Sequence, residues 1–366
     1  MKISNIKKIL VLQPDHIGDV LLATPMIHAI RNRFPKAKID ILIGSWARDI
    51  VDKSSDIDTI YVYNFSKFNR SRQKCPSKLK TFLKLRKNRY DLCVMARSRN
   101  VLVRFFAFLI KAKHRIGFKV SGKDAFLNIR VEQKDPRQHV VDRNLLLAKE
   151  LGADISNPKF MLKFSEGDKL WAKIFLELPI MNNNGNGKKP DFACSWGKSA
   201  GKSLVGINPG SGTEAKMWPF ERFAKVADEI ARRFNARIVI TGSPSESDVK
   251  LAEQVASEMK TKPIIAAGRT DLKKLAALIS LLDLYVSNDS GPLHIAVAVG
   301  TKVIGIYSGT DYPSMWGPYG GKHQVLSRAE DCDKLPCRKT ICDYADHVCL
   351  KNISVKDVIN AVKKYV

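Results

Sequence analysis

The chain has 366 residues, 45% of them hydrophobic, which is enough to bury the cores of two domains. Its 62 Lys and Arg residues against 36 Asp and Glu give a formal net charge of +26, which points to an anionic partner such as a phosphorylated substrate, an anionic lipid or nucleic acid. No stretch approaches the roughly 20 apolar residues of a spanning helix, and the basic start lacks the apolar core of a secretory signal. We therefore expect a cytoplasmic protein with reduced cysteines.

The positive charge is concentrated in the first half of the chain. Residues 1–181 hold 36 Lys and Arg against 17 Asp and Glu, a net +19, and residues 67–119 hold 17 basic residues and one acid. A run of charge is usually only a solvated surface, but two successive basic amphipathic helices in this region can also lie on an anionic membrane. Nucleic acid is the competing partner, and no recognisable nucleic-acid-binding module supports it.

The first part of the chain alternates apolar strands with helices. Strands are predicted at residues 8–13, 39–43 and 58–63, and a helix is predicted at 20–34. Strands that are apolar throughout indicate a parallel sheet with helices on both faces, and such sheets bind ligands at the loops after the strands. Asp19 lies in the first of these loops, as either an acid that complements a helix dipole or a general base. His16 is a second, weaker candidate for the base.

A polar segment rich in Asn, Gly and Lys separates two halves. Residues 182–203 lack apolar periodicity and are expected to form a linker. The predicted domains are therefore residues 1–181 and residues 204–366, and in the second the alternation of strands and helices resumes.

The strand predicted at residues 204–207 ends in a turn that is suited to an anion. Pro209, Gly210, Ser211 and Gly212 break the strand, and Lys216 follows before a helical pattern resumes. Backbone N–H groups at such a turn and at a helix start bind phosphate, and Lys216 adds positive charge. The alternative is a tight turn with a surface lysine.

A second turn of this kind follows the strand near residues 284–286. Asn288 and Asp289 lead into Ser290 and Gly291, and Pro292 favours the first turn of a helix. His294, one turn into that helix, is either a core histidine or another group at the phosphate. Two such turns at neighbouring strand ends of one domain favour a diphosphate ligand.

Four cysteines precede the last helix within 18 residues: Cys332, Cys337, Cys342 and Cys349. This density raises the alternative of a zinc or iron–sulfur site, although zinc modules more often use Cys-x2-Cys pairs. We expect no bound metal in segment 332–349 and keep these cysteines as the alternative site.

Three groups of residues occur in a characteristic order. They are Ile17-Gly18-Asp19-Val20 with Thr24-Pro25, then Asn208-Pro209-Gly210-Ser211 with Lys216-Met217-Trp218-Pro219, then Asn288 through His294. In this order they resemble glycosyltransferase family 9, the heptosyltransferase family of lipopolysaccharide core assembly. The resemblance implies an α/β fold of the GT-B class, with two Rossmann-like domains facing a central cleft.

The resemblance also implies a reaction. The chain would move heptose, or a related sugar, from an ADP-sugar to the lipopolysaccharide inner core or a similar anionic glycolipid, with inversion and without a metal or other cofactor. The family's usual donor is ADP-L-glycero-D-manno-heptose. We expect a monomer, associated with the inner face of the cytoplasmic membrane and not with nucleic acid. The alternatives are another GT-B sugar-nucleotide enzyme, such as an epimerase, and a non-catalytic protein that binds membrane or nucleic acid.

Residue roles follow from the same resemblance. Asp19 would be the general base, and Lys216 would stabilise the departing ADP. The donor would be bound by Ser211, Gly212, Lys216, Glu246, Asp289, Ser290, Gly291 and His294. The acceptor would be contacted by His16, Arg97 and Arg99.

Overall fold

The computed structural model describes residues 5–65, 77–96, 101–120, 124–177, 202–344 and 346–366. Contacts divide the chain into two compact units, Met1–Lys163 and Phe164–Val366. Both are α/β units with a parallel sheet, as expected. The candidate acceptor residues Arg97 and Arg99, and most of the expected linker, lie outside the described residues. Among the helices that the structure describes, none has the length and apolar character needed to cross a bilayer.

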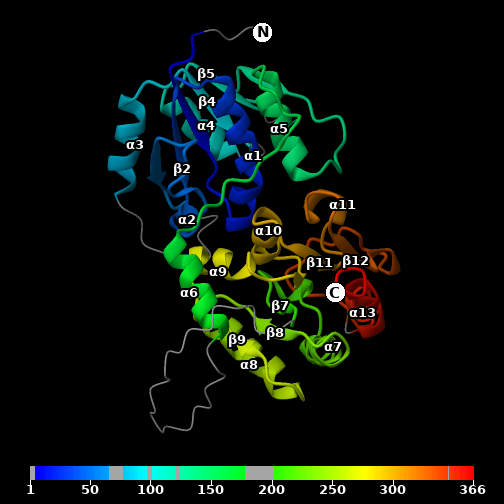
Figure 1. Ribbon diagram of the computed structural model, residues 1–366. Helices are drawn as coiled ribbons and strands as arrows, with labels where there is room; N and C mark the ends of the chain where they lie inside the picture. Colours follow the sequence, from blue (N-terminus) through cyan, green and yellow to red (C-terminus); the bar gives the residue numbers. More distant parts are fainter. Residues whose placement is uncertain (1–4, 66–76, 97–100, 121–123, 178–201, 345) are drawn as a thin grey trace. The chain divides into compact units, whose positions relative to one another are not determined.

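The first unit is built on a six-stranded parallel sheet in the order β3-β2-β1-β4-β5-β6. Figure 1 labels β2, β4 and β5 of this sheet. Its strands are β1 (Lys8–Leu12), β2 (Lys38–Ile43), β3 (Thr59–Val62), β4 (Leu92–Met95), β5 (His114–Phe118) and β6 (Ile129–Val131). Its α-helices are α1 (Ile17–Arg33), α2 (Arg48–Val51), α3 (Lys78–Lys87), α4 (Val101–Leu109) and α5 (Val140–Glu150), and a short 3-10 helix, η1 (Ser45–Ala47), precedes α2. The three predicted strands and the helix after β1 are confirmed, and that helix begins at Ile17, earlier than expected.

Thr24 compensates for a proline inside α1. Pro25 has no N–H to donate to the carbonyl of Leu21 one turn earlier. The Thr24 hydroxyl donates to that carbonyl instead, at 2.7 Å, and accepts a hydrogen bond from Met161 N at 3.1 Å. One buried hydroxyl therefore completes α1 and ties it to a segment 137 residues later.

We expect Thr24→Val to destabilise the protein by about 2–4 kcal/mol, because it leaves two buried backbone groups without a partner at nearly constant volume. The free energy of unfolding in urea, followed by circular dichroism, measures the effect. Thr59→Val makes the same chemical change in β3, where valine suits a strand, and should alter stability by less than about 0.5 kcal/mol. Equal stability of the two variants would show that the Thr24 hydroxyl is dispensable.

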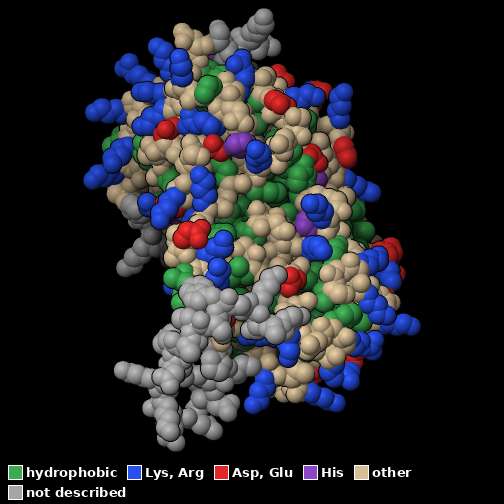
Figure 2. Space-filling view, viewed as in Figure 1, with side chains coloured by type: hydrophobic (Ala, Val, Ile, Leu, Met, Phe, Trp, Pro, Cys, Tyr) green, Lys and Arg blue, Asp and Glu red, His purple; other side chains and the backbone are tan. Residues whose placement is uncertain are grey.

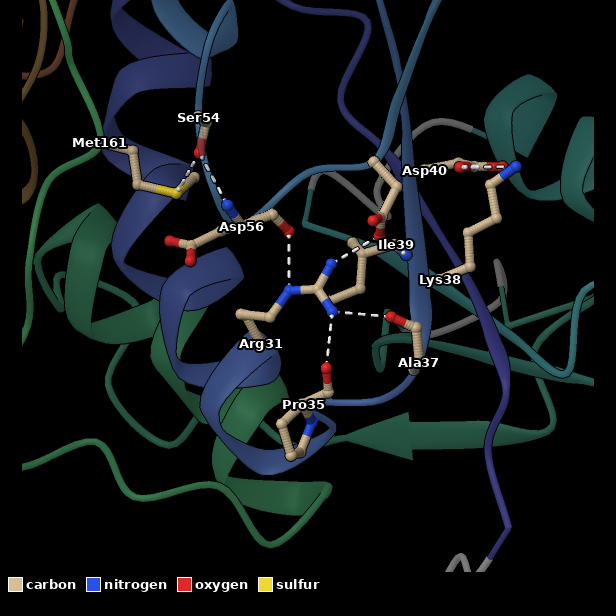
Figure 3. Close-up of polar contacts among 10 residues, drawn as sticks. Arg31, Pro35, Ala37, Lys38, Ile39, Asp40, Ser54, Asp56 and Met161 are labelled. Atoms are coloured by element: carbon tan, nitrogen blue, oxygen red, sulfur yellow. Dashed lines mark hydrogen bonds and ion pairs between the residues drawn. The ribbon is translucent and has the colours of Figure 1, made fainter.

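The other end of α1 is fixed by Arg31 (Figure 3). Its guanidinium donates to Ala37 O at 2.7 Å, to Asp56 O at 3.3 Å and to the carboxylate of Asp58 at 2.6 Å. Asp58 also accepts from Ile39 N at 2.7 Å. Partial burial raises the pKa of Asp58, but the hydrogen bonds from Ile39 and Arg31 and the charge of Arg31 outweigh it, so the net pKa lies below its ordinary value. The ionised carboxylate thus joins the end of α1 to the start of β2.

The second unit has a six-stranded parallel sheet in the order β12-β11-β10-β7-β8-β9. Its strands are β7 (Leu204–Asn208), β8 (Arg237–Ile240), β9 (Ile264–Ile265), β10 (Leu284–Asn288), β11 (Lys302–Tyr307) and β12 (Gln324–Ser327). Its longer helices are α6 (Glu166–Glu177), α7 (Phe220–Arg233), α8 (Glu246–Glu258), α9 (Leu272–Ile279), α10 (Gly291–Ala298) and α13 (Val355–Val362). Short helices are η3 (Glu214–Lys216), α11 (Pro313–Trp316), η4 (Ala329–Asp331) and α12 (Val348–Lys351).

Helix α6 packs with the second unit, although the sequence places it before the expected boundary at residue 181. The Nζ of Lys274 on α9 lies 5.3 Å from the centre of the Trp171 ring on α6. The side chain of Arg237, at the start of β8, donates to Leu176 O. The polar composition that marks the linker follows α6, so a boundary drawn from composition differs from the division that the contacts make between Lys163 and Phe164.

Candidate active site

The turns after β7 and β10 are adjacent because these two strands pair in parallel. Ile207 lies opposite Val286, and Asn208 lies opposite Ser287. Both strands therefore end at the same edge of the sheet. This brings together the two turns that the sequence predicts as anion sites.

Two buried asparagines hold the turns together. Asn208, at the end of β7, donates from Nδ2 to Gly210 O at 2.9 Å and to Ser290 Oγ at 3.2 Å. Asn288, at the end of β10, donates to Pro209 O at 2.7 Å and accepts from Trp218 N at 3.1 Å. The sequence motifs include both residues, but sequence reasoning gave them no role. The signal that could have identified them is an asparagine at the last position of each of the two strands.

Lys216 is held directly against the second turn. Its Nζ lies 2.5 Å from Oδ2 of Asp289, and the Ser211 hydroxyl donates to Asp289 O at 2.8 Å. The lysine side chain is 27% exposed and the aspartate side chain 10% exposed, so solvent reaches the cation more than the anion. The structure thus gathers Ser211, Lys216, Asp289 and Ser290 at one place. A phosphate beside them would meet two hydroxyls, the start of α10 and a cation that is paired with the carboxylate of Asp289.

A third loop lies at the same edge, since β8 pairs with β7 in parallel. Glu246 is the exposed first residue of α8, which follows this loop. Asp248, two residues later, accepts from Ser243 N at 2.9 Å. A Cβ on Gly210 would lie 3.3 Å from Oδ1 of Asp248, so a glycine lets the first turn approach this loop closely. His294, also expected at the donor, is 4% exposed inside α10.

The cysteine-rich segment supports the turn that carries Lys216. Ala215, the preceding residue, donates from N to Thr340 O at 3.0 Å, and its carbonyl oxygen lies 3.1 Å from Nε2 of His347. Burial lowers the pKa of His347, although this carbonyl and the charge of Glu214 oppose the shift. A neutral imidazole protonated at Nε2 can donate to Ala215 O. Sequence reasoning did not find this contact, which spans 132 residues.

The four cysteines of this segment are free thiols. Cys349 accepts from Gly309 N at 3.3 Å through its sulfur, and Cys337 N donates to Gly309 O at 3.0 Å. Burial raises the pKa of the Cys349 thiol, which keeps it protonated at neutral pH. Within the part of the chain that the structure describes, no group of three or more His, Cys, Asp or Glu residues is placed to hold a metal ion.

Asp19 and His16 lie in the first unit, where β1 leads into α1. His16 is the N-cap of α1, and its backbone carbonyl accepts from Val20 N at 3.0 Å. Asp19 is a half-buried acid in the first turn. Gln13 donates to Oδ2 of Asp15 at 3.1 Å and to Asp19 O at 3.5 Å, so a buried amide braces this loop. The position suits both roles foreseen for Asp19, a partner of the helix dipole and a base at the end of a strand.

The sequence model for glycosyltransferase family 9 (heptosyltransferase) matches residues 79–346, which is most of the chain. The chain belongs to glycosyltransferase family 9. It is therefore a glycosyltransferase, which confirms the expected enzyme class rather than a non-catalytic binding protein.

Relatives and solved structures agree with this family 9 assignment. The lipopolysaccharide core heptosyltransferase OpsX of Haemophilus influenzae is 29% identical over 334 residues, 89% of this chain and 85% of that protein. A family 9 glycosyltransferase structure from Veillonella parvula has a TM-score of 0.77 and 25% identity, covering 98% of this chain and 97% of that one. The Escherichia coli heptosyltransferase WaaC, solved with ADP, has a TM-score of 0.70 and 16% identity, covering 98% of this chain and 100% of that one. These similarities confirm the expected GT-B fold class.

Proposed function

We propose that this family 9 enzyme moves heptose, or a related sugar, from an ADP-sugar to the lipopolysaccharide inner core or a similar anionic glycolipid. The observation that carries the proposal is the pair of joined turns after β7 and β10, where Lys216 and the start of α10 meet. The relatives support the sugar and the nucleotide, because OpsX is named a core heptosyltransferase and WaaC was solved with ADP. ADP-L-glycero-D-manno-heptose is the donor that we propose.

The second unit would bind the donor and stabilise the leaving group. Negative charge builds on the diphosphate as its bond to the sugar breaks, so positive groups fixed beside it lower the barrier. Lys216 would pass from Asp289 to the diphosphate, and the N–H groups of Ser290 and Gly291 at the start of α10 would contact it. Ser211, Gly212 and His294 would complete the phosphate site, and Glu246 would contact the ribose.

Asp19 would act in the first unit as the general base. The acceptor hydroxyl would form its bond to the anomeric carbon as the bond to ADP breaks on the opposite face, and its proton would go to Asp19. This displacement inverts the anomeric configuration. His16, Arg97 and Arg99 would contact the acceptor, whose phosphates suit the two arginines.

The reaction would need no metal ion, because Lys216 and the amides of the second turn supply the positive field that a divalent cation supplies in other transferases. We propose that the enzyme works as a monomer in the cytoplasm, at the inner face of the membrane that carries its acceptor.

The test is thermal unfolding of the full chain with ADP, UDP or GDP, each with magnesium or with a chelator. We expect ADP, but not UDP or GDP, to stabilise the protein, by about 2.7 kcal/mol at 100 times its dissociation constant. The chelator should leave this stabilisation unchanged. No stabilisation by ADP would contradict the donor site. A shift that requires magnesium would contradict metal independence.

A transfer assay then separates the proposed reaction from an epimerase. The enzyme is incubated with ADP-heptose, with and without inner-core acceptor from which the lipid chains have been removed. We expect ADP release to depend on the acceptor. Conversion of the donor at the same rate without acceptor would instead favour a different sugar-nucleotide enzyme.

A further inference from the structure

Helices α3 and α4 cover the same face of the first sheet. Leu85 of α3 and Val103 and Phe106 of α4 belong to one buried cluster with Leu10 of β1 and Met95 of β4. The helices also contact each other: the rings of Phe82 and Phe106 are 5.6 Å apart, and Arg86 donates to Leu109 O at 2.5 Å. Each helix therefore also has an outer side that faces away from the sheet.

These outer sides expose large apolar side chains. Six of the ten exposed large hydrophobic residues in the described chain lie on the two helices: Leu79, Leu83, Val101, Leu102, Phe105 and Phe108. Leu79 and Leu83 are 66% and 53% exposed at the i, i+4 spacing of one helical face, and Leu102 is 63% exposed. Scattered single hydrophobic residues are ordinary on a protein surface, but a group on two adjacent helices marks an interaction site.

The same part of the chain is strongly basic. Residues 77–96 and 101–119 carry eleven Lys and Arg, of which Arg104 is buried, and one acid, Asp91. The carboxylate of Asp91 accepts from Lys7 N and Lys8 N, each at 2.9 Å. Lys80, Lys84 and Lys87 are exposed on α3. Figure 2 shows Lys and Arg side chains crowded over the region where Figure 1 places α3. We call Leu79, Lys80, Leu83, Lys84, Lys87, Leu102, Phe105 and Phe108 the α3–α4 surface.

We propose that the α3–α4 surface docks the enzyme on an anionic lipid bilayer. The apolar side chains would enter the headgroup region, and the lysines would lie against lipid phosphates. Nucleic acid would satisfy the lysines but not the exposed leucines and phenylalanines. A second copy of the chain, joined through this surface by a two-fold axis, would place like charges against each other. The choice of a membrane rests on the proposed function, whose acceptor is a lipid.

The test measures sedimentation of the full-length enzyme with vesicles of phosphatidylglycerol and phosphatidylcholine, and with vesicles of phosphatidylcholine alone. We expect binding to the anionic vesicles only, and weaker binding as salt rises. The charge variant Lys80→Glu/Lys84→Glu/Lys87→Glu keeps good helix formers and should bind about 100-fold more weakly. The apolar variant Leu79→Ser/Leu83→Ser/Leu102→Ser should bind at least about tenfold more weakly.

A matched control reverses the charge of three lysines in the second unit. Lys225 on α7, Lys356 on α13 and Lys363, the residue that follows α13, line a groove of about 680 Å³. Their replacement by glutamate makes the same change in net charge. This control should bind vesicles far more strongly than the charge variant of α3. Equal loss in the two charge variants would mean that net charge alone attracts the protein, which would overturn the assigned surface.

Two further measurements separate this inference from the proposed reaction. Transfer to acceptor without lipid chains should be normal in both α3–α4 variants. If the charge variant loses this transfer, the lysines bind the acceptor and the assignment of the docking surface is wrong.

The second measurement is binding to double-stranded DNA. The assignment would also be wrong if the enzyme bound DNA as tightly as anionic vesicles and the charge variant lost this binding. Failure of the parent enzyme to transfer heptose would contradict the proposed function and leave the vesicle result standing.

Discussion

Asp19→Asn should give a folded protein that binds ADP as tightly as the parent chain but transfers sugar about 10²–10⁴ times more slowly. Asparagine is nearly the same size as aspartate but cannot accept the proton of the attacking hydroxyl. The donor groups lie on other elements, in the second unit, so the dissociation constant of ADP should not change. The comparison needs the initial rate of transfer from ADP-heptose and a calorimetric titration with ADP.

The control is a second acid in the first turn of a helix. Asp142 occupies this position in α5, within the same unit as Asp19. If Asp19 only complements the dipole of α1, both Asp→Asn variants should lose no more than about 1 kcal/mol of stability and keep their transfer rates. Nearly normal transfer by Asp19→Asn, with loss of transfer in His16→Asn, would assign the base to His16.

Lys216→Ala should weaken ADP binding by about 10–100-fold and slow transfer by about 10²–10³-fold. The first effect is the loss of a charged hydrogen bond to the diphosphate, and the second is the loss of a cation where negative charge develops. The variant should also be less stable, because the carboxylate of Asp289 is only 10% exposed and loses the cation that lies 2.5 Å away. Saturation kinetics with ADP-heptose and thermal unfolding measure these effects separately.

A double-mutant cycle on Lys216 and Asp289 distinguishes two roles of the lysine: binding of the diphosphate and stabilisation of the fold. In Lys216→Ala/Asp289→Asn the uncompensated charge is gone, so stability should return toward that of Asp289→Asn alone. Transfer should stay slow, because the cation for the diphosphate is still missing. Recovery of both stability and transfer in the double variant would show that Lys216 serves only to neutralise Asp289.

The strands and the two turns could be predicted because each depends on a short stretch of sequence. The first strand is a run of apolar residues, Ile9 to Leu12, that is buried on both sides in the sheet. Pro209 and Pro292 each mark the point where a strand gives way to a turn or helix. Both turns were therefore located from local chemistry alone.

How the turns are joined could not be predicted, because the contacts connect residues far apart in the chain. Asn208 and Ser290 are 82 positions apart, and their contact requires β10 to be inserted beside β7 in the strand order. His347 contacts Ala215 across 132 positions, from a segment whose cysteines raised metal binding only as an alternative. Local patterns do not identify individual contact partners, so these contacts are visible only in the folded chain.

The packing of α6 decides where the chain can be divided without damage. The polar segment before β7 looks like the natural point of separation, but a cut there would leave α6 attached to the first fragment. A second fragment that began at residue 204 would lack the helix whose Trp171 contacts Lys274 and whose Leu176 carbonyl accepts from Arg237. We therefore expect a second half that folds by itself to begin near Phe164, where the contacts divide the chain. Expression of the halves as separate proteins should follow this division rather than the change in composition.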